Sequence, residues 1–249
     1  MPPFAFKRFS LQHENSSMKV GTDGVLLGAW TQLPERGEDY PILEVGCGCG
    51  LVSLMLAQRL SVREGEGWSP IRAVDIHSAS CIEAAGNVAR SPFENCVEVE
   101  QADFLHLPPS YEEGSFGLIV SNPPFFSHAL KSPDKRRNMA RHNDSLPFGA
   151  LVREAERLLF TGGRLALVLS PEAFYEVSSC MCMEHRIWRP RRITRVFSRP
   201  GKPCERILCE WEKTEKTVSV CENTLFIYRQ DGSYDENYRN LVREFYLWA

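Results

Sequence analysis

The chain has 249 residues, 43% of them apolar, and a formal net charge of −3. This composition is enough to bury the core of one α/β domain, and it excludes a disordered or fibrous protein. No apolar run approaches the roughly 20 residues that cross a bilayer, and the first residues lack the order of a signal peptide, so we expect neither a membrane protein nor a secreted one.

Strands alternate with helices through the first half of the chain. After an N-terminal segment, four apolar runs predict strands, and two helical patterns fall between the first three of these runs. Such alternation is typical of a parallel sheet covered by helices. The predicted strands lie near 41–46, 71–76, 97–101 and 117–121, and the helices lie near 49–60 and 78–90.

A charged loop at 127–144 separates this half from the next predicted helix. That helix spans 145–160, and we expect it to end at the pair Gly162-Gly163, as helices often end at glycine. Arg164–Leu169 then predicts an apolar strand, and Pro171 stands at a favoured position for opening a further helix.

The last part of the chain predicts a hairpin and a tail. Residues 187–213 indicate two long strands around the turn at 199–203, where two prolines flank Gly201-Lys202. The tail, 218–249, adds a strand at 224–228 and a helix.

The nine cysteines include no Cys-x-x-Cys pair. The close pairs Cys47/Cys49 and Cys180/Cys182 fall in a glycine-rich stretch and a predicted helix, without clustered histidines. We therefore expect reduced thiols of a cytoplasmic protein and no metal site.

A glycine-rich turn follows the first core strand. Ile42–Val45 runs into Gly46 and Gly48, where the absence of side chains lets the backbone approach a ligand closely. A dinucleotide site would need a third glycine at position 51, which is leucine. Glu44 would repel a phosphate but suits a cationic ligand with an amino group and a sulfonium, which describes S-adenosylmethionine.

Two further strands end in acidic residues. Asp75 lies 29 positions after Gly46, where a βαβ unit would place the acceptor for a ribose diol. Asp103 follows the next strand in the same way.

The most informative stretch is Ile119–Phe125, an apolar strand that ends in Asn122-Pro123-Pro124-Phe125. Two consecutive prolines exclude a helix and leave a stiff extended loop. The Asn122 oxygen and a carbonyl of the proline pair can accept both N–H bonds of an amino group, while Phe125 stacks on its ring. Alone, the stretch is equally a proline-rich turn with a capping Asn. Because this stretch follows the glycine turn and the two acidic strand ends along the chain, the set as a whole favours an enzyme that acts on an amine.

Basic residues form two runs despite the acidic total. For either run alone, an equal alternative is a solvated face whose basic residues pair with acidic residues elsewhere on the surface. Because one run directly follows the Asn122 loop, the two together favour contact with an RNA backbone. The candidate RNA-binding residues are Lys131, Lys135, Arg136, Arg137 and Arg141 in the first run and Arg191, Arg192 and Arg195 in the second.

These motifs resemble class I S-adenosylmethionine-dependent methyltransferases of the amino-methylating Asn-Pro-Pro-aromatic group. More narrowly, the chain resembles bacterial N6-adenine methyltransferases that modify adenosine 37 of a valine transfer RNA. Three stretches carry the narrower likeness. They are 6–13 followed by 18–30, the Asn-Pro-Pro-Phe-Phe motif with its basic run to His142, and the tail with Asp231–Tyr234 and a helix closing in Phe245–Leu247.

The resemblance implies a Rossmann-like fold with a mostly parallel seven-stranded sheet, an antiparallel hairpin and helices on both faces. It implies a single methyltransferase domain over 1–249, with an N-terminal segment (1–40), a core (41–213) and a C-terminal extension (214–249).

The resemblance also assigns roles to residues. Lys19, Thr22 and Asp23 would close over the methionine end of the cofactor, and Glu44, Gly46 and Gly48 would form its loop. Asp75 would bind the ribose and Asp103 the adenine amine. Asn122 would border the cofactor and bind the target amine, with Pro123, Pro124 and Phe125 completing the catalytic motif.

The implied reaction is methyl transfer from S-adenosylmethionine to an adenosine N6 amine of tRNA. The implied enzyme is a cytoplasmic monomer that uses no metal and does not associate with a membrane. Alternatives that keep the chemistry are methylation of guanine N2 in ribosomal RNA, of adenine in DNA or of a protein glutamine. A non-catalytic RNA-binding module is a further alternative. The last alternative is a small-molecule methyltransferase or a nucleotide-linked oxidoreductase, neither of which would need the two basic runs.

Overall fold

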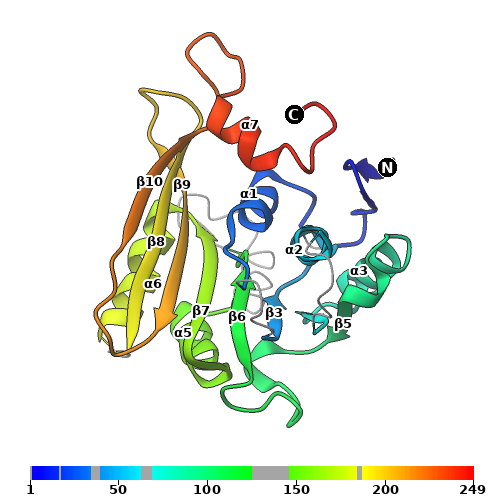
Figure 1. The fold of residues 1–249 in the computed structure, drawn as a ribbon. Coiled ribbons are helices and arrows are strands. Elements are labelled where there is room, and N and C mark those ends of the chain that lie inside the picture. The colour runs from blue at the N-terminus through cyan, green and yellow to red at the C-terminus, as the bar shows by residue number, and fades with distance from the viewer. Residues whose placement is uncertain (1, 17, 35–39, 63–68, 125–145, 184–186) are drawn as a thin grey trace, which may run out of the picture.

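A mixed eight-stranded sheet runs through the molecule and carries helices on both faces (Figure 1). The computed structural model describes residues 2–16, 18–34, 40–62, 69–124, 146–183 and 187–249. In spatial order the strands are β10 (Cys221–Phe226), β8 (Trp188–Phe197), β9 (Cys204–Lys213), β7 (Leu159–Leu169), β6 (Phe116–Ser121), β3 (Ile42–Val45), β4 (Ile71–Asp75) and β5 (Val97–Gln101).

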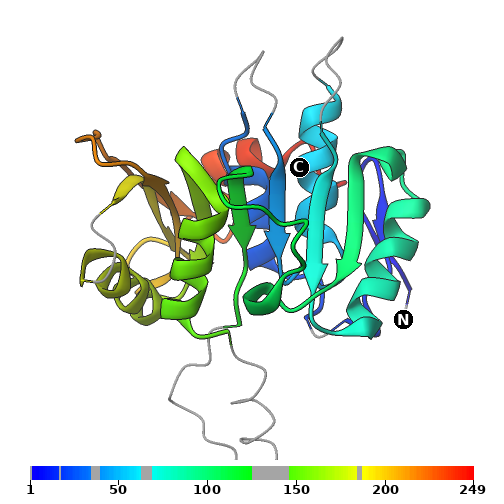
Figure 2. The same ribbon diagram turned by 90° about the horizontal axis from the view of Figure 1, so that it is seen from below.

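Five neighbouring strands, β5, β4, β3, β6 and β7, are parallel, and β9 runs antiparallel between β7 and β8. The chain proceeds from β3 outward to β4 and β5 and then returns to the other side of β3 as β6. The carboxyl ends of β3 and β6 therefore flank the point where the strand order reverses, as Figure 2 shows from below. Open α/β sheets bind their ligands at this point.

The helices bury two separate apolar layers, with α5 and α6 on one face and α1, α2 and α3 on the other (Figures 1 and 2). In α5 the buried residues Leu151, Val152, Ala155 and Leu158 share one stripe, as an amphipathic helix requires. The helices are α1 (Thr22–Trp30), α2 (Leu51–Ser61), α3 (Ser78–Ala89), α5 (Phe148–Leu158), α6 (Pro171–Met183) and α7 (Glu236–Val242), with short 3₁₀ turns η1 (Glu94–Cys96) and η2 (Phe104–His106).

The central strands are buried along their whole length. All six residues of β6 and all four of β3 are buried, because helices cover both faces of the sheet there. This burial explains why the central strands are continuous apolar runs in the sequence.

The two flanks of the chain meet on the α1 side of the sheet. β1 (Phe4–Ala5) and β2 (Ser10–Leu11) form a small hairpin. Lys7 lies in the loop between them, and its backbone N–H donates to the Phe245 carbonyl at 2.8 Å. The rings of Phe6 and Tyr246 stack with centroids 5.7 Å apart. Figure 1 shows the C-terminus beside α7 and the N-terminus on the far side of the C-terminal loop, above α3.

The expected fold class is confirmed, and the hairpin of β8 and β9 lies where the sequence predicts it. The tail strand, expected as part of an extension, joins the sheet edge as an eighth strand parallel to β8. No helix in the part of the chain that the structure describes is long and apolar enough to span a membrane.

The expected role of Gly162-Gly163 is wrong. The helix ends at Leu158, and both glycines lie inside β7. The pairing of β6 with β7 jumps from Phe116–Leu159 to Leu118–Arg164, so the glycines fall in a bulge of the longer strand.

Candidate active site

The turn after β3 is held open by two glycines. Gly46 and Gly48 have φ angles of 72° and 55°, in the left-handed region that favours glycine. A Cβ atom at either position would meet no atom within 4 Å, so a ligand can approach the backbone there. The Gly46 N–H donates to the Val74 carbonyl at 2.9 Å, which fixes the turn against β4.

A cavity of about 380 Å³ opens beside this turn. Its volume falls in the range of small-molecule sites. The cavity brings together residues from the N-terminal segment, β3 with its turn, and the end of β6. The predicted site residues in its lining are Lys19, Thr22, Asp23, Glu44, Gly46, Gly48 and Asn122.

Glu44 supplies a buried carboxyl group to the cavity. Its side chain is 3% exposed, and it accepts hydrogen bonds from the Ser53 hydroxyl and from the Ser53 N–H, the latter at 2.9 Å. Burial raises the pKa of Glu44 from 4.5 to about 8, although both Ser53 bonds oppose the rise. A cation in the cavity would favour the ionised form.

Two cysteines of the glycine turn, Cys47 and Cys49, also line the cavity. A hydrogen bond with Cys81 and then burial raise the pKa of Cys47 well above its usual range. Burial raises the pKa of Cys49 to about 12. Both groups are therefore thiols at neutral pH and poor nucleophiles.

Asp75 ties the glycine turn to the end of β4. One carboxylate oxygen accepts from the Gly48 N–H and the other from the His77 N–H, both at 2.9 Å. An ionised carboxylate has about four acceptor positions, so each oxygen can accept a further bond. Among the residues described, Asp75 does not line the cavity.

Asp103 caps the short turn after β5. Its carboxylate accepts from the Leu105 N–H at 2.9 Å and contacts His106 Nδ1 at 2.7 Å. The hydrogen bond from His106 is the main cause of the lowered pKa of Asp103. Asp103 is likewise outside the described lining of the cavity.

Asn122 stands at the end of β6 and reaches the cavity. The preceding Ser121 hydroxyl donates to the Val45 carbonyl at 2.8 Å, which holds the ends of β6 and β3 together. To other described residues the Asn122 carboxamide makes no hydrogen bond. Pro123 is buried and Pro124 exposed, and Phe125 lies outside the described residues.

The N-terminal segment is fixed over the glycine turn by α3. The Glu83 carboxylate, 7% exposed, accepts the backbone N–H groups of Glu14, Asn15 and Ser16 at 2.8, 3.0 and 2.9 Å. One turn further, the Asn87 side chain accepts from the Gln12 N–H and donates to the Gln12 carbonyl and to the Cys49 carbonyl of the glycine turn.

Within the segment, Lys19 Nζ donates to the His13 carbonyl at 3.2 Å, and His13 Nδ1 accepts from the Val20 N–H at 3.1 Å. Asp23 at the start of α1 forms an ion pair of 2.8 Å with Arg206 of β9. This pair joins two sides of the cavity, since both residues line it.

Sequence reasoning missed the side of the cavity built by the second half of the chain. No local pattern marks these positions, because they reach the cavity only once the hairpin of β8 and β9 joins the sheet at β7 and the tail follows β10. The missed lining residues there are Val196, Glu205, Arg206 and Ile227.

The candidate RNA-binding residues divide into two groups. Lys131, Lys135, Arg136, Arg137 and Arg141 lie outside the described residues. Arg191 pairs with Glu212 at 3.0 Å and Arg195 with Glu222 at 2.6 Å, and these four side chains are partly exposed.

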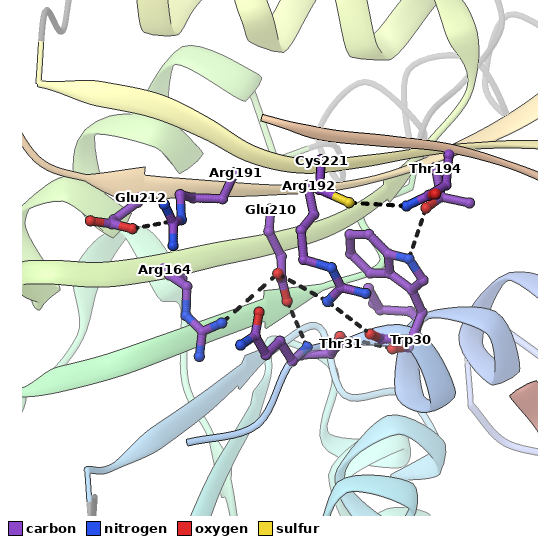
Figure 3. A network of polar contacts seen from close by, with 12 residues as sticks. Trp30, Thr31, Arg164, Arg191, Arg192, Thr194, Glu210, Glu212 and Cys221 are labelled. Carbon is purple, nitrogen blue, oxygen red and sulfur yellow. Dashed lines mark hydrogen bonds and ion pairs between the residues drawn. The ribbon is translucent and has the colours of Figure 1, made fainter. Parts of the chain in front are cut away.

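Arg192 has an internal role in a polar network, shown in Figure 3. Its guanidinium lies 4.1 Å from the Trp30 ring centroid, donates to the Trp30 carbonyl, and pairs at 3.2 Å with fully buried Glu210. Glu210 also accepts from the Gln32 N–H at 2.7 Å and lies 3.9 Å from Arg164. This network joins the end of α1 to the sheet. RNA contact by Arg192 stays a prediction, which the geometry does not favour because the guanidinium already makes these internal contacts.

Among the described residues, no three His, Cys, Asp or Glu side chains gather as a metal site would require. The expected absence of a metal from the whole protein stays a prediction.

The sequence matches a known family. The family profile described as "Methyltransferase domain" matches residues 37–218. A protein of Phocaeicola vulgatus is 38% identical and one of Parabacteroides distasonis 40% identical, each aligned over 99% of this chain and 98% of its own length. One of Photorhabdus laumondii is 36% identical over 98% of this chain and 95% of its own length. All three are named tRNA1(Val) (adenine(37)-N6)-methyltransferase.

Solved structures share the fold. A protein of Agrobacterium tumefaciens, described as a predicted O-methyltransferase, superposes with a TM-score of 0.68 at 17% identity over 90% of this chain and 96% of its own. A geranyl diphosphate methyltransferase with bound GPP and sinefungin gives 0.52 at 14% identity, over 76% of each chain. At such identities the likeness extends to the fold alone.

Proposed function

Because this chain belongs to the family of tRNA1(Val) (adenine(37)-N6)-methyltransferases, we propose that it methylates the N6 amine of adenosine 37 in a valine transfer RNA, with S-adenosylmethionine as donor. The observation that carries the proposal is the single cavity lined by Glu44, the glycine turn and Asn122. A donor site and a target-amine site must share one cleft for direct transfer, and this cavity joins Asn122 to Glu44 and the glycine turn.

The described residues fit the cofactor. The Glu44 carboxyl group suits the cationic methionine end, and the open backbone at Gly46 and Gly48 admits a close ligand. The remaining acceptor positions of Asp75 suit a ribose diol beside the turn, and Asp103 is the proposed neighbour of the adenine amine. When bound, S-adenosylmethionine supplies an electrophilic methyl group on a sulfonium.

Asn122 is the proposed catalytic residue, because its carboxamide reaches the cavity without a hydrogen bond to another described side chain or backbone group. The side-chain oxygen accepts one N–H of the target amine, and a carbonyl of the proline pair accepts the other. Both bonds orient the nitrogen lone pair toward the donor. Orientation of this kind can supply roughly 7–11 kcal/mol of the barrier reduction.

Two further parts complete the proposal. Phe125, outside the described residues, stacks on the target ring. The adenosine turns out of its stack to reach the cavity, at a cost on the order of a few kcal/mol that is smaller in a loop than in a duplex. The chemistry requires no general base, because the methylated amine loses its proton readily afterwards.

The proposed location is the cytoplasm. None of the nine cysteines forms a disulfide, which is typical of a reducing compartment. Transfer RNA is the proposed partner, and the monomer is the proposed state.

Replacement of Asn122 by alanine tests the catalytic assignment. We expect methyl transfer to tRNA to fall at least about 100-fold, because the amine loses its orientation. We expect the dissociation constant for S-adenosylmethionine, measured by calorimetry, to change less than about threefold. Asn95→Ala, an exposed amide in η1, is the control and should alter neither quantity. Equal loss of both quantities in Asn122→Ala would show that Asn122 is structural.

A further inference from the structure

A second groove, of about 980 Å³, lies where the two flanks of the chain meet. It is lined by Lys7 and by residues from 229 to 249. All of these positions lie outside residues 37–218, which match the methyltransferase domain. The groove is therefore built from the two segments that flank the matched methyltransferase domain.

The groove is fixed by contacts between the two flanks. Lys7 Nζ donates to the carbonyls of Arg243 at 2.5 Å and Ala249 at 3.0 Å, and its backbone N–H donates to Phe245. The Tyr246 ring stacks on Phe6, one residue before Lys7. The basic residues at the groove are thus held on a packed framework.

Positive charge dominates the groove. Four basic side chains line it, Lys7, Arg229, Arg239 and Arg243, against two acidic ones, Glu236 and Glu244. The nearby acids of the same segment are directed elsewhere, because Asp231 accepts from the Ser233 N–H and Asp235 caps the first turn of α7.

The three arginines of the groove are placed to bind an anion. Arg229 pairs with Glu236 at 3.6 Å and Arg243 with Glu244 at 3.1 Å, and the four side chains are between 51% and 77% exposed. Such exposed pairs are weak and exchange readily with a stronger partner. Arg239 is exposed, and its guanidinium has no partner among the described residues.

Aromatic rings line the same groove. Tyr234 and Trp248 stack with centroids 3.9 Å apart and planes 10° from parallel, yet they remain 36% and 42% exposed. Tyr246 supports Trp248 from 5.0 Å. Basic groups beside partly exposed, rigid aromatic rings suit single-stranded RNA, because its bases stack on aromatic rings while its phosphates pair with cations.

The groove begins beside the active site. Ile227 lines the catalytic cavity, and Arg229, two residues later, lines the groove. Two extended residues span only about 7 Å. The carbonyl of Phe197 fixes this connection by accepting from the Ile227 N–H at 3.0 Å.

We propose that this groove binds the tRNA strand next to the target nucleotide, with its phosphates on Arg229, Arg239 and Arg243 and an unpaired base on the exposed part of the Tyr234–Trp248 stack. The proposal rests on the proposed function, since it assigns the substrate of that function a second contact. The C-terminal extension is then an RNA-binding element.

Charge reversal at Arg239 tests this inference, because no internal ion pair of a described residue is lost. We expect Arg239→Glu to raise the dissociation constant for an unmodified valine tRNA about tenfold at low salt. We also expect the slope of log affinity against log salt to fall by about one unit, with cofactor affinity unchanged. Lys216→Glu is the matched control, since it makes the same charge change at an exposed site before β10, at the opposite end of that strand.

A second pair of variants tests the stacking surface. Trp248→Leu should weaken tRNA binding severalfold, and Trp248→Phe should retain most of the affinity because it keeps an aromatic face. Equal loss in both variants would assign Trp248 to packing and contradict the stacking contact.

Wild-type affinity and salt slope in Arg239→Glu, or equal losses in Lys216→Glu, would overturn the inference. So would unchanged tRNA binding in Arg239→Glu together with an altered oligomeric state, which would assign the groove to a protein partner. Groove-dependent tRNA binding by a wild-type protein that transfers no methyl group would support the groove and contradict the proposed function.

Discussion

Glu44 is the buried group whose charge the cofactor is expected to change. Its pKa of about 8 means that the folded protein keeps this carboxyl protonated at neutral pH. Because the folded-state pKa lies above the ordinary 4.5, its contribution to stability is fully present below about pH 4.5 and is lost as the pH rises toward 8.

Binding of a cationic ligand should favour the ionised form of Glu44 over the protonated form. We expect the Glu44 pKa to fall on cofactor binding, so that one proton is released and affinity rises nearly tenfold per pH unit between about pH 6 and 7. Calorimetry in two buffers of different ionisation enthalpy measures the release. Glu44→Gln should bind more weakly and release no proton. A wild-type affinity that is independent of pH over this range would place the cation elsewhere.

Several residues that line the cavity could be predicted because their signals are local. Glu44, Gly46, Gly48 and Asn122 each stand at the end of an apolar strand, and the parallel sheet brings those ends together. Arg206 and Ile227 could not be predicted, because they reach the cavity only through strand pairing and through the tail after β10.

At the scale of elements, α3 connects the N-terminal segment to the glycine turn. Glu83 holds three N–H groups of the segment, and Asn87 bonds both Gln12 and the Cys49 carbonyl. Bonds to a charged acceptor contribute roughly 1.5–3 kcal/mol each. The helix thus positions a segment that carries Lys19 and Asp23 into the cavity.

Replacement of Glu83 by glutamine should loosen this segment. The amide turns a donor toward N–H groups that need an acceptor, so we expect cofactor affinity to fall about tenfold and the melting temperature to drop by several degrees. Turnover at saturating cofactor should be nearly unchanged, because Asn122 is not affected. Glu94→Gln, an exposed carboxylate in η1, is the control. Unchanged cofactor affinity in Glu83→Gln would mean that the segment is ordered without this bond.

The elements themselves were predictable to different degrees. The central strands are apolar runs, and they lie where the sequence predicts them. Helix α1 was not predicted, because seven of its nine residues are buried and the segment has no polar face to reveal a helical period. The Gly162-Gly163 pair looks like a helix stop, but only the pairing of β7 with β6 shows a bulge.

At the scale of the whole molecule, the two flanks complete the methyltransferase fold. The tail adds β10 to the sheet edge, places α7 against α1, and contributes Ile227 to the cavity, while the N-terminal segment supplies Lys19, Thr22 and Asp23. We therefore propose that residues 1–249 form one domain. Its three parts, 1–40, 41–213 and 214–249, contribute to one site.

The relation between flanks and core was only partly visible in the sequence. The class of fold follows from the alternating pattern of strands and helices, which is a local property. The meeting of Lys7 with residues near the end of the chain is a contact between distant segments, so no pattern within either segment predicts it.

The central claim is most directly tested by incubating the protein with S-adenosylmethionine and an unmodified valine tRNA, followed by mass spectrometry of the digested nucleosides and fragments. We predict one N6-methyladenosine per molecule, located at position 37, and none in a transcript with guanosine at that position. Absence of methylation in the valine tRNA, or methylation of ribosomal RNA, DNA or protein in its place, would contradict the account.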